Sequence, residues 1–333
     1  MMQEYYSLKD YNSFHLDVST RRFERFSTIE QLSSLLETNL QTMILGGGSN
    51  VLFTKNFDGL ILKNDVTGMR VIKEDEDHAY VKAGAGESWH ELVLFCLQHN
   101  LGGVENLALI PGSVGASPMQ NIGAYGAEIK DVFYSLEAFH IKTKHVSNFL
   151  NSDCEFGYRE SVFKNRLRDQ FVITSVTFRL DKKHAYNTSY GAVQKELDIM
   201  KVKELSIQAI AEAVIRIRRS KLPDPNVIGN AGSFYKNPEV SEKVFDDFKK
   251  EFPGIVGYPL VHGKVKLAAG WLIEQCGWKG YRKGDAGCHA QQALVLVNYG
   301  SASGQEIFSL SKEIIDSVLK KFGVALHREV NIV

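Results

Sequence analysis

Apolar residues recur at helical spacing in several stretches of the chain, and three of these stretches begin with the same capping signature. Ser27, Ser88 and Ser303 are each followed by a glutamate three residues later and then by an apolar periodic run. Serine and glutamate in this arrangement satisfy the free backbone N–H groups at a helix start. The pattern therefore predicts helices near residues 27, 88 and 303, with further helices over 205–219 and 266–277.

Strand patterns alternate with these helices. Short apolar runs at 43–45 and 59–62, two longer runs at 132–142 and 171–180, and a continuous apolar run at 294–297 predict strands. Alternating residues from 69 to 85 flank an acidic turn and predict a hairpin. Helices and strands are thus mixed along the chain. We expect an α+β protein with lobes at 1–66 and 67–204 and a third unit at 205–333.

Two glycine-rich segments interrupt this pattern in the first half of the chain. Residues 46–50 read GGGSN, and residues 111–126 read PGSVGASPMQNIGAYG with almost no formal charge. Glycines let the backbone come close to a ligand, and successive amides form concave anion sites. The pair favours a dinucleotide cofactor held along its length, whereas the alternative is that both are ordinary loops.

Composition narrows the class of protein. The 333 residues carry 39 basic and 39 acidic side chains, so no overall field attracts nucleic acid or an anionic membrane. No apolar run is long enough for a membrane span, and the N-terminus lacks the pattern of a secretory signal. The four cysteines lack metal or disulfide spacing, which predicts reduced thiols in a cytoplasmic protein and no metal site.

Several polar residues in turns are candidates for chemistry, and each has a plain structural alternative. Arg159 follows a Gly-Tyr turn and can clamp a carboxylate, or it can pair with a neighbouring glutamate on the surface. Ser233 lies in a small-residue turn that is not a Gly-x-Ser-x-Gly elbow, and such a hydroxyl usually stabilises its own turn.

Three further candidates are equally open from the residues alone. Lys221 and Asn237 can serve a phosphate, although a solvated lysine is the plainer interpretation. Glu329 is a candidate for chemistry only if the fold brings a partner residue next to it. Tyr190 precedes a glycine, which fits either a mobile lid or an exposed turn.

Taken together, seven segments resemble the UDP-N-acetylenolpyruvoylglucosamine reductase family, in one order over nearly the whole chain. The segments are 45–53 (LGGGSNVLF), 106–126 (NLALIPGSVGASPMQNIGAYG), 156–164 (FGYRESVFK), 221–225 (KLPDP), 229–238 (GNAGSFYKNP), 266–276 (KLAAGWLIEQC) and 292–298 (QALVLVN). The Ser-Tyr-Gly at 189–191 is similar to the family's longer type, in which a tyrosine loop closes over the substrate.

The resemblance implies a two-lobed vanillyl-alcohol-oxidase-type FAD-binding domain followed by an α+β substrate domain. It also implies that NADPH reduces non-covalent FAD, which then reduces the enolpyruvyl sugar nucleotide in peptidoglycan precursor synthesis, a route that supports cell shape and division. The residues that it implies for the cofactor are Gly46, Gly47, Gly48, Ser49, Asn50, Ile110, Pro111, Gly112, Ser113, Gly115, Ala116, Ser117, Gln120, Asn121, Ile122, Gly123, Tyr125 and Gly126. For the UDP-sugar it implies Tyr190, Lys221, Asn237, Tyr258 and Gln292.

The resemblance also assigns three catalytic roles. Arg159 would hold the charge that develops on the substrate carboxylate, Ser233 would donate the proton, and Glu329 would assist from the opposite side. The chain is then expected to act as a monomer.

Two departures from the family pattern accompany this expectation. Residues 12–15 read Asn-Ser-Phe-His where the family often has Asn-Thr-Phe-Gly, which leaves the N-terminal entry to the flavin domain open. The glycine turn at 46–48 has no histidine of the kind that tethers flavin in related oxidases. The rival interpretations are an FAD-dependent alcohol oxidase of the same fold and a catalytically inactive nucleotide-binding module.

Overall fold

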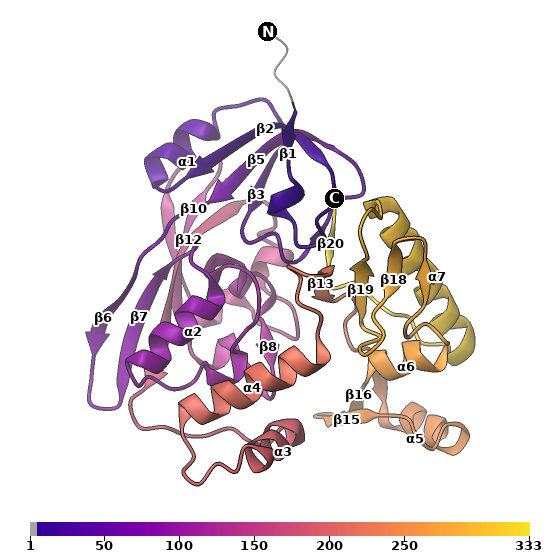
Figure 1. The fold of residues 1–333 in the computed structure, drawn as a ribbon. Coiled ribbons are helices and arrows are strands. Elements are labelled where there is room, and N and C mark those ends of the chain that lie inside the picture. Colours follow the sequence, from indigo (N-terminus) through magenta and orange to yellow (C-terminus); the bar gives the residue numbers. More distant parts are fainter. Residues whose placement is uncertain (1–4) are drawn as a thin grey trace. The chain divides into compact units, whose positions relative to one another are not determined.

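The computed structural model describes residues 5–333, and these form two compact units. Unit 1 holds Thr20–Gly48 and Asp58–Ser220 with Tyr5 and Tyr6, and unit 2 holds Ser7–Ser19, Ser49–Phe57 and Lys221–Val333. The expectation about the N-terminal signal rests partly on residues 1–4, which lie outside the described residues. The mixture of helices and strands confirms the α+β class (Figure 1).

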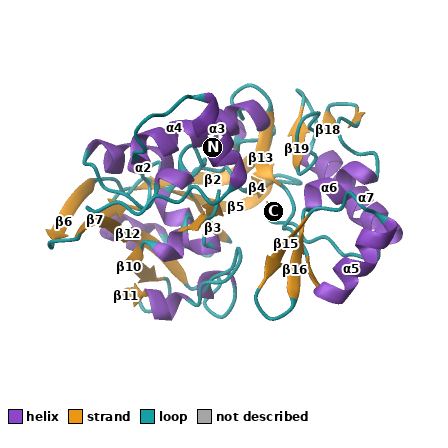
Figure 2. Cartoon of the chain, turned by 90° about the horizontal axis from the view of Figure 1, so that it is seen from below, coloured by secondary structure: helices purple, strands orange, loops and turns teal. Residues whose placement is uncertain are grey.

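Unit 1 is built on two sheets. The first has the strand order β1–β2–β5–β3, and the second has the order β11–β10–β12–β7–β6, whose strands run side by side in Figure 2. The strands of the first sheet are β1 (Tyr6–Ser7), β2 (Ser19–Phe26), β5 (Phe57–Asn64) and β3 (Thr42–Leu45). Those of the second are β11 (Val146–Leu150), β10 (Phe133–His140), β12 (Phe171–Asp181), β7 (His78–Gly84) and β6 (Met69–Glu74), and a small hairpin joins β8 (Gly123–Ala124) to β9 (Ala127–Glu128).

Four α-helices belong to unit 1: α1 (Ile29–Leu35), α2 (Trp89–Gln98), α3 (Gly191–Ile199) and α4 (Ile207–Lys221, whose last residue falls in unit 2). The predicted capping serine Ser88 accepts a hydrogen bond from the Glu91 amide at the start of α2. Buried side chains of α2 and α4 share one core with β12, where Trp89 packs edge-to-face on Phe178 with ring centroids 5.6 Å apart.

This shared core explains where the observed units differ from the expected domains. The helix predicted at 205–219 is α4, and its buried Ile210, Val214 and Ile217 pack into the core of unit 1 rather than into the C-terminal unit. A second cluster joins Phe26 and Leu60 of the first sheet to Phe139 of the second. The two expected lobes therefore share buried apolar contacts within one unit, and the chain divides after Ser220 instead of at 204.

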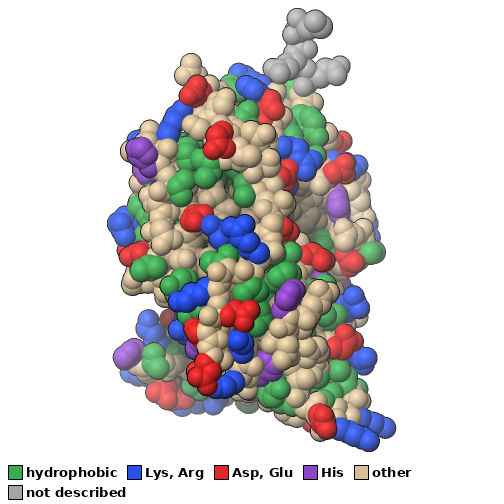
Figure 3. Space-filling model, turned by 90° about the vertical axis from the view of Figure 1, so that its left-hand side faces the viewer, with side chains coloured by type: hydrophobic (Ala, Val, Ile, Leu, Met, Phe, Trp, Pro, Cys, Tyr) green, Lys and Arg blue, Asp and Glu red, His purple; other side chains and the backbone are tan. Residues whose placement is uncertain are grey.

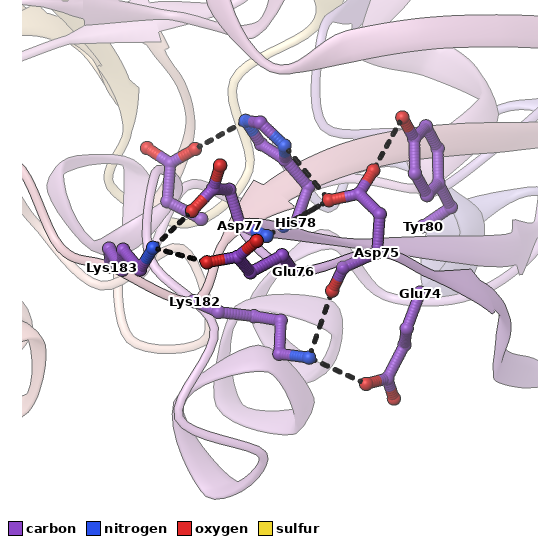
Figure 4. A network of polar contacts seen from close by, with 9 residues as sticks. Glu74, Asp75, Glu76, Asp77, His78, Tyr80, Lys182 and Lys183 are labelled. Atoms are coloured by element: carbon purple, nitrogen blue, oxygen red, sulfur yellow. Dashed lines mark hydrogen bonds and ion pairs between the residues drawn. The ribbon is translucent and has the colours of Figure 1, made fainter.

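The acidic turn of the predicted hairpin is neutralised locally. Lys182 Nζ lies 3.0 Å from a Glu74 carboxylate oxygen, and Lys183 Nζ lies 2.6 Å from one of Asp77 (Figure 4). Asp75 accepts hydrogen bonds from the amides of His78 and Asp77, and the bond from His78 contributes most to lowering the pKa of its carboxyl. The turn thus stabilises its own hairpin. Acidic and basic side chains are likewise interspersed on the face that Figure 3 draws.

Unit 2 contains two larger sheets, one two-stranded sheet and three α-helices. Its strands are β13 (Gly229–Ser233), β19 (Val295–Asn298), β18 (Ala286–Cys288) and β17 (Arg282–Lys283) in one sheet, and β14 (Glu239–Ser241), β16 (Lys264–Leu267) and β15 (Gly257–Leu260) in the other. Its helices are α5 (Glu242–Glu251), α6 (Ala269–Gln275) and α7 (Gly304–Phe322), and β20 (Asn331–Ile332) pairs in parallel with β4 (Val51–Leu52).

Two predicted helices of unit 2 have different outcomes. Helix α7 has the predicted capping box at Ser303 and Glu306 and ends at Gly323, which has a φ of 66°. Burying apolar side chains such as Ile307 and Ile314 contributes about 1.5–3 kcal/mol each. The helix predicted over 266–277 is shorter, because residues 264–267 form β16 and hydrogen-bond between two neighbouring strands.

No helix within residues 5–333 is both long enough and apolar enough to cross a membrane. Across the same residues, no three His, Cys, Asp or Glu side chains gather where they could hold a metal ion. All four cysteines are free thiols, and burial raises the pKa of Cys154 and Cys288 to about 12. These thiols therefore stay protonated and unreactive at neutral pH.

Candidate functional site

Within unit 1, the glycines at 46–48 of the first glycine-rich turn lie against the longer glycine-rich segment. A Cβ added to Gly47 would lie 2.9 Å from Gly112 Cα, and one added to Gly46 would collide with the Ser113 hydroxyl. Gly112 itself has a φ of 115°, which a residue with a side chain rarely adopts. The turns predicted separately from the sequence thus form one surface of backbone and hydroxyl groups.

The longer turn is held in place by the segment that leads into α2. The Trp89 amide donates to Gly112 O over 3.0 Å, the Val114 amide to Glu87 O over 2.8 Å, and the Gly115 amide to Ala85 O over 2.9 Å. Neutral amides and hydroxyls fixed in this way suit a diphosphate, which needs donors rather than bulky side chains. The residues present therefore fit the diphosphate of a dinucleotide.

Some residues of the longer segment have structural roles for their side chains. The side-chain nitrogen of Asn121 donates to Glu128 Oε2 and to Gly157 O, each over 3.0 Å. Its side-chain oxygen accepts from the backbone amide of Lys130 over 3.1 Å. The Ser117 hydroxyl donates to Val114 O over 2.7 Å. Asn121 and Ser117 can meet a ligand only through their backbone, because their side chains hold the loop together.

Arg159 contacts this same segment, 111–126, from outside it. Its two terminal nitrogens donate to Gly123 O over 2.5 Å and to Asn121 O over 3.4 Å, and its guanidinium carbon stands 5.5 Å from the Tyr158 ring centroid. The residue is half-buried and has a φ of 56°. Of the glutamates near Arg159 in the sequence, Glu155 pairs with Arg166, whose Nη2 lies 2.6 Å from a Glu155 carboxylate oxygen.

Tyr190 lies beside the longer glycine-rich segment, 111–126, in unit 1. Its ring packs edge-to-face on Tyr125 with centroids 5.4 Å apart, and it is 40% exposed. Asn106 donates to both Tyr125 O and Asn187 O over 2.9 Å, and Asn187 donates to Gly126 O over 3.0 Å. The tyrosine loop is therefore fastened to residues 125–126.

The sequence analysis missed Arg218. Its Nε donates to Leu109 O over 3.2 Å, and its guanidinium hydrogen-bonds the hydroxyl of Tyr125. Burial lowers the pKa of Arg218 and raises that of Tyr125, while their contact favours the charged form of each. A signal was present, because Arg218 follows Ile210 and Val214 at intervals of four on the apolar face of α4.

In unit 2, a β-bulge places Ser233. Asn230 pairs with Val297 and Ser233 with Val295, so two residues of β13 face one residue of β19. The side chain of buried Asn230 accepts from the Gly232 amide over 2.9 Å, and Gly232 has a φ of 68°. Bulges redirect side chains at the ends of strands, and Ser233 is exposed here.

Glu329 is brought beside the same strand end. The Glu329 amide donates to Phe234 O and the Lys236 amide to His327 O, both over 2.9 Å, so 327–329 run antiparallel to 234–236. Asn50 of the first glycine turn belongs to unit 2 and donates to Glu329 O over 3.3 Å. Ser233 and Glu329, about 100 residues apart in sequence, are thus held on adjoining backbone segments.

Two predicted substrate residues lie at the start of α6, and a third lies on a strand paired with the strand before that helix. Asn237 Oδ1 accepts from the Ala269 amide over 2.9 Å, and Gln292 Oε1 would stand 3.2 Å from a Cβ on Gly270. Tyr258 is 44% exposed on β15 and pairs with Lys266 of β16, the strand before α6. Lys221 is exposed at the last position of α4.

The N-terminal departure from the family pattern supports unit 2 rather than an entry to the flavin domain. Asn230 and Asn298 both donate to this segment, at Ser13 O and Phe14 O, each over 2.9 Å. His15 has a φ of 54° and its Nε2 contacts Pro225 O at 2.7 Å. This left-handed backbone explains why glycine suits the position. Through Asn230, the segment is hydrogen-bonded to β13, the strand that carries Ser233.

Comparisons with known proteins point to one family over both halves of the chain. Residues 25–143 match the model of an FAD-binding domain, and residues 224–333 match the C-terminal domain of UDP-N-acetylenolpyruvoylglucosamine reductase. The chain is 48% identical to the enzyme of that name from Flavobacterium johnsoniae, with 100% of this chain and 99% of the relative covered. It is 46% identical to the one from Pseudomonas putida, with 99% and 98% covered.

A solved structure supports the fold. The crystal structure of UDP-N-acetylenolpyruvylglucosamine reductase from Thermus caldophilus superposes with a TM-score of 0.67 at 22% identity, and 99% of this chain and 98% of that chain are covered. This likeness confirms the α+β architecture of both units.

Proposed function

Because the chain belongs to the UDP-N-acetylenolpyruvoylglucosamine reductase family, we propose that Arg159, Ser233 and Glu329 are its catalytic residues in an FAD-dependent reduction. The reaction converts UDP-N-acetylglucosamine enolpyruvate to UDP-N-acetylmuramate for peptidoglycan synthesis, with NADPH as the source of hydride. FAD, when bound, supplies this hydride to the vinyl terminus of the substrate.

Arg159 is suited to the charge that the reaction builds. Hydride addition to an enol ether conjugated to a carboxylate places negative charge on the neighbouring carbon and on that carboxylate. Fixed positive donors lower the barrier where such charge develops. The two carbonyl contacts of Arg159 hold its guanidinium in one orientation, so the side chain does not need to reorganise when the charge appears.

Ser233 is suited to deliver the proton that completes the reaction. The carbon beside the carboxylate accepts a proton as the charge on it is discharged, and a well-placed hydroxyl can supply it. The exposed side chain can then take a replacement proton from water. Glu329 would assist the transfer. The backbone pairing of 327–329 with 234–236 is the main support for this proposal, because it holds Ser233 and Glu329 at one strand end.

The remaining assignments follow the same family pattern. The UDP-sugar is proposed to contact Tyr190, Lys221, Asn237, Tyr258 and Gln292, and FAD to lie along residues 46–50 and 110–126. Tyrosine hydroxyls, amides and a lysine suit a diphosphate that binds and leaves in every cycle. We further propose that the enzyme is a monomer and that it works in the cytoplasm. Its four free thiols fit a reducing compartment.

One experiment tests the function. Purified protein should show a flavin absorbance band that denaturation releases, and anaerobic NADPH should bleach it. Adding the enolpyruvyl sugar nucleotide should restore the band quickly, whereas air alone should restore it slowly. An alcohol oxidase would instead be reoxidised quickly by air, and an inactive module would respond to neither substrate.

A further inference from the structure

A strained residue opens the turn proposed to hold the cofactor. Leu109 has a φ of 59°, in the left-handed region that side chains with a Cβ disfavour, and it precedes Ile110 and Pro111. A leucine stays in this conformation only where its surroundings hold it. Both of its backbone polar groups have side-chain partners, one from α2 and one from α4. Figure 1 labels both helices.

The two partners are not equivalent in their response to pH. Arg218 of α4 donates to Leu109 O and stays charged at any physiological pH. His90 of α2 does the reverse, because its Nδ1 accepts from the Leu109 amide over 3.0 Å. That bond requires a neutral imidazole whose proton is on Nε2. A protonated imidazole would point an N–H at the Leu109 N–H, and the bond would be lost.

We propose that His90 is a positioning residue that, only in its neutral form, holds Leu109 and thereby the 110–113 turn, so that FAD binds more weakly as His90 becomes protonated. This inference rests on the proposed placement of FAD along that turn. His90 touches the backbone of the turn and does not need to touch the cofactor.

The charged groups around His90 favour the neutral form. Burial is the largest influence and lowers the pKa of His90; Glu91 on its own helix raises it, and Arg219 and Arg218 of α4 lower it. The pKa in the folded protein therefore lies below the usual value of about 6.5. The stability that neutral His90 contributes to the folded protein is therefore fully present above the usual value. It is lost as pH falls through the lower pKa that His90 has in the folded protein.

The test measures FAD release on dilution of the holoenzyme between pH 7.5 and 5.5, by the fluorescence of free flavin. The FAD dissociation constant of the wild type should rise as pH falls, with a slope that approaches about tenfold per pH unit once His90 is protonated in the FAD-free protein. His90→Asn offers Oδ1 to the Leu109 amide and cannot be protonated, so it should bind as the wild type does at pH 7.5 and lose this pH dependence. His90→Ala should bind weakly at every pH.

His99→Asn is the matched control, because His99 lies on the same helix but its Nδ1 contacts the Phe95 carbonyl at 2.8 Å and therefore donates. It should keep the wild-type pH dependence. The proposal is overturned if His90→Asn follows the wild-type curve, or if His90→Ala binds FAD normally at pH 7.5.

Failure of the proposed function can be told apart from failure of this inference. If the purified protein carries no flavin, the function fails, while the role of His90 is still read from thermal unfolding. The wild type should then lose more stability than His90→Asn between pH 7.5 and 5.5, and equal losses would overturn the role of His90.

Discussion

Adding one methyl group at Gly47 should disturb the proposed cofactor site without touching any catalytic residue. In Gly47→Ala the new Cβ would lie 2.9 Å from Gly112 Cα and 3.3 Å from Gly112 C, whereas carbon atoms in contact normally stand about 3.5–4.0 Å apart. Neither neighbour is the end of a flexible side chain, so the two turns must separate by about 0.5–1 Å. Overpacking of this kind typically costs about 1–3 kcal/mol.

The FAD-free protein can relieve this strain by letting the two turns separate. If FAD binds only when the turns are close together, binding restores the strain and the cost appears in FAD affinity. A loss of 1–3 kcal/mol corresponds to roughly 5- to 150-fold weaker binding. FAD titration of Gly47→Ala measures this directly, and Gly191→Ala in the same unit is the control, because nothing lies within 4 Å of its added Cβ. Wild-type FAD affinity in Gly47→Ala would refute the placement of the cofactor against these turns.

Three further outcomes are expected. Arg159→Lys keeps the charge but cannot donate in two fixed directions to Gly123 O and a carboxylate, so kcat should fall on the order of 10²-fold, and a near-normal kcat would argue against its role. Tyr190→Phe keeps the ring on Tyr125, so stopped-flow traces should show unchanged flavin reduction by NADPH but substrate binding weaker by about 1–3 kcal/mol; equal losses in both would count against the lid. Gly229→Ala puts a Cβ 2.7 Å from the Phe14 carbonyl carbon, which should lower the thermal midpoint and the activity, whereas Gly254→Ala, with open space around it, should change neither.

Local patterns predicted the elements of the fold well where the chain itself supplies the signal. The capping serines at 88 and 303 begin helices because their hydroxyls satisfy amides three residues away, which needs no distant partner. The β16 strand was mistaken for the start of a helix, because pairing with β14 and β15 decides its conformation and those strands lie elsewhere in the sequence. The division after Ser220 was also missed, since α4 is assigned to a unit by the core it packs into.

In the candidate site, too, the residues that local patterns mark were predicted, and those that depend on distant contacts were not. The two glycine turns were recognisable from composition, because positive φ and close backbone approach select glycine. Ser233 and Glu329 looked ordinary as sequence, and only the family resemblance singled them out. The contact that brings them together is a backbone pairing between distant segments, which no local pattern encodes. Arg218 and His90 were passed over because their importance lies in which backbone atom each one contacts.

The most direct test of the account is stopped-flow measurement of both half-reactions in Ser233→Ala. NADPH should reduce the flavin at nearly the wild-type rate, since no proton from Ser233 is needed there. Reoxidation by the enolpyruvyl sugar nucleotide should slow by several orders of magnitude, because a carbon must be protonated in that step, and a general acid contributes on the order of 10²–10⁴-fold or more. Ser233→Cys should recover part of the rate, since a thiol can also donate a proton. Equal slowing of both half-reactions, or wild-type reoxidation in Ser233→Ala, would contradict the assignment of Ser233 as the proton donor.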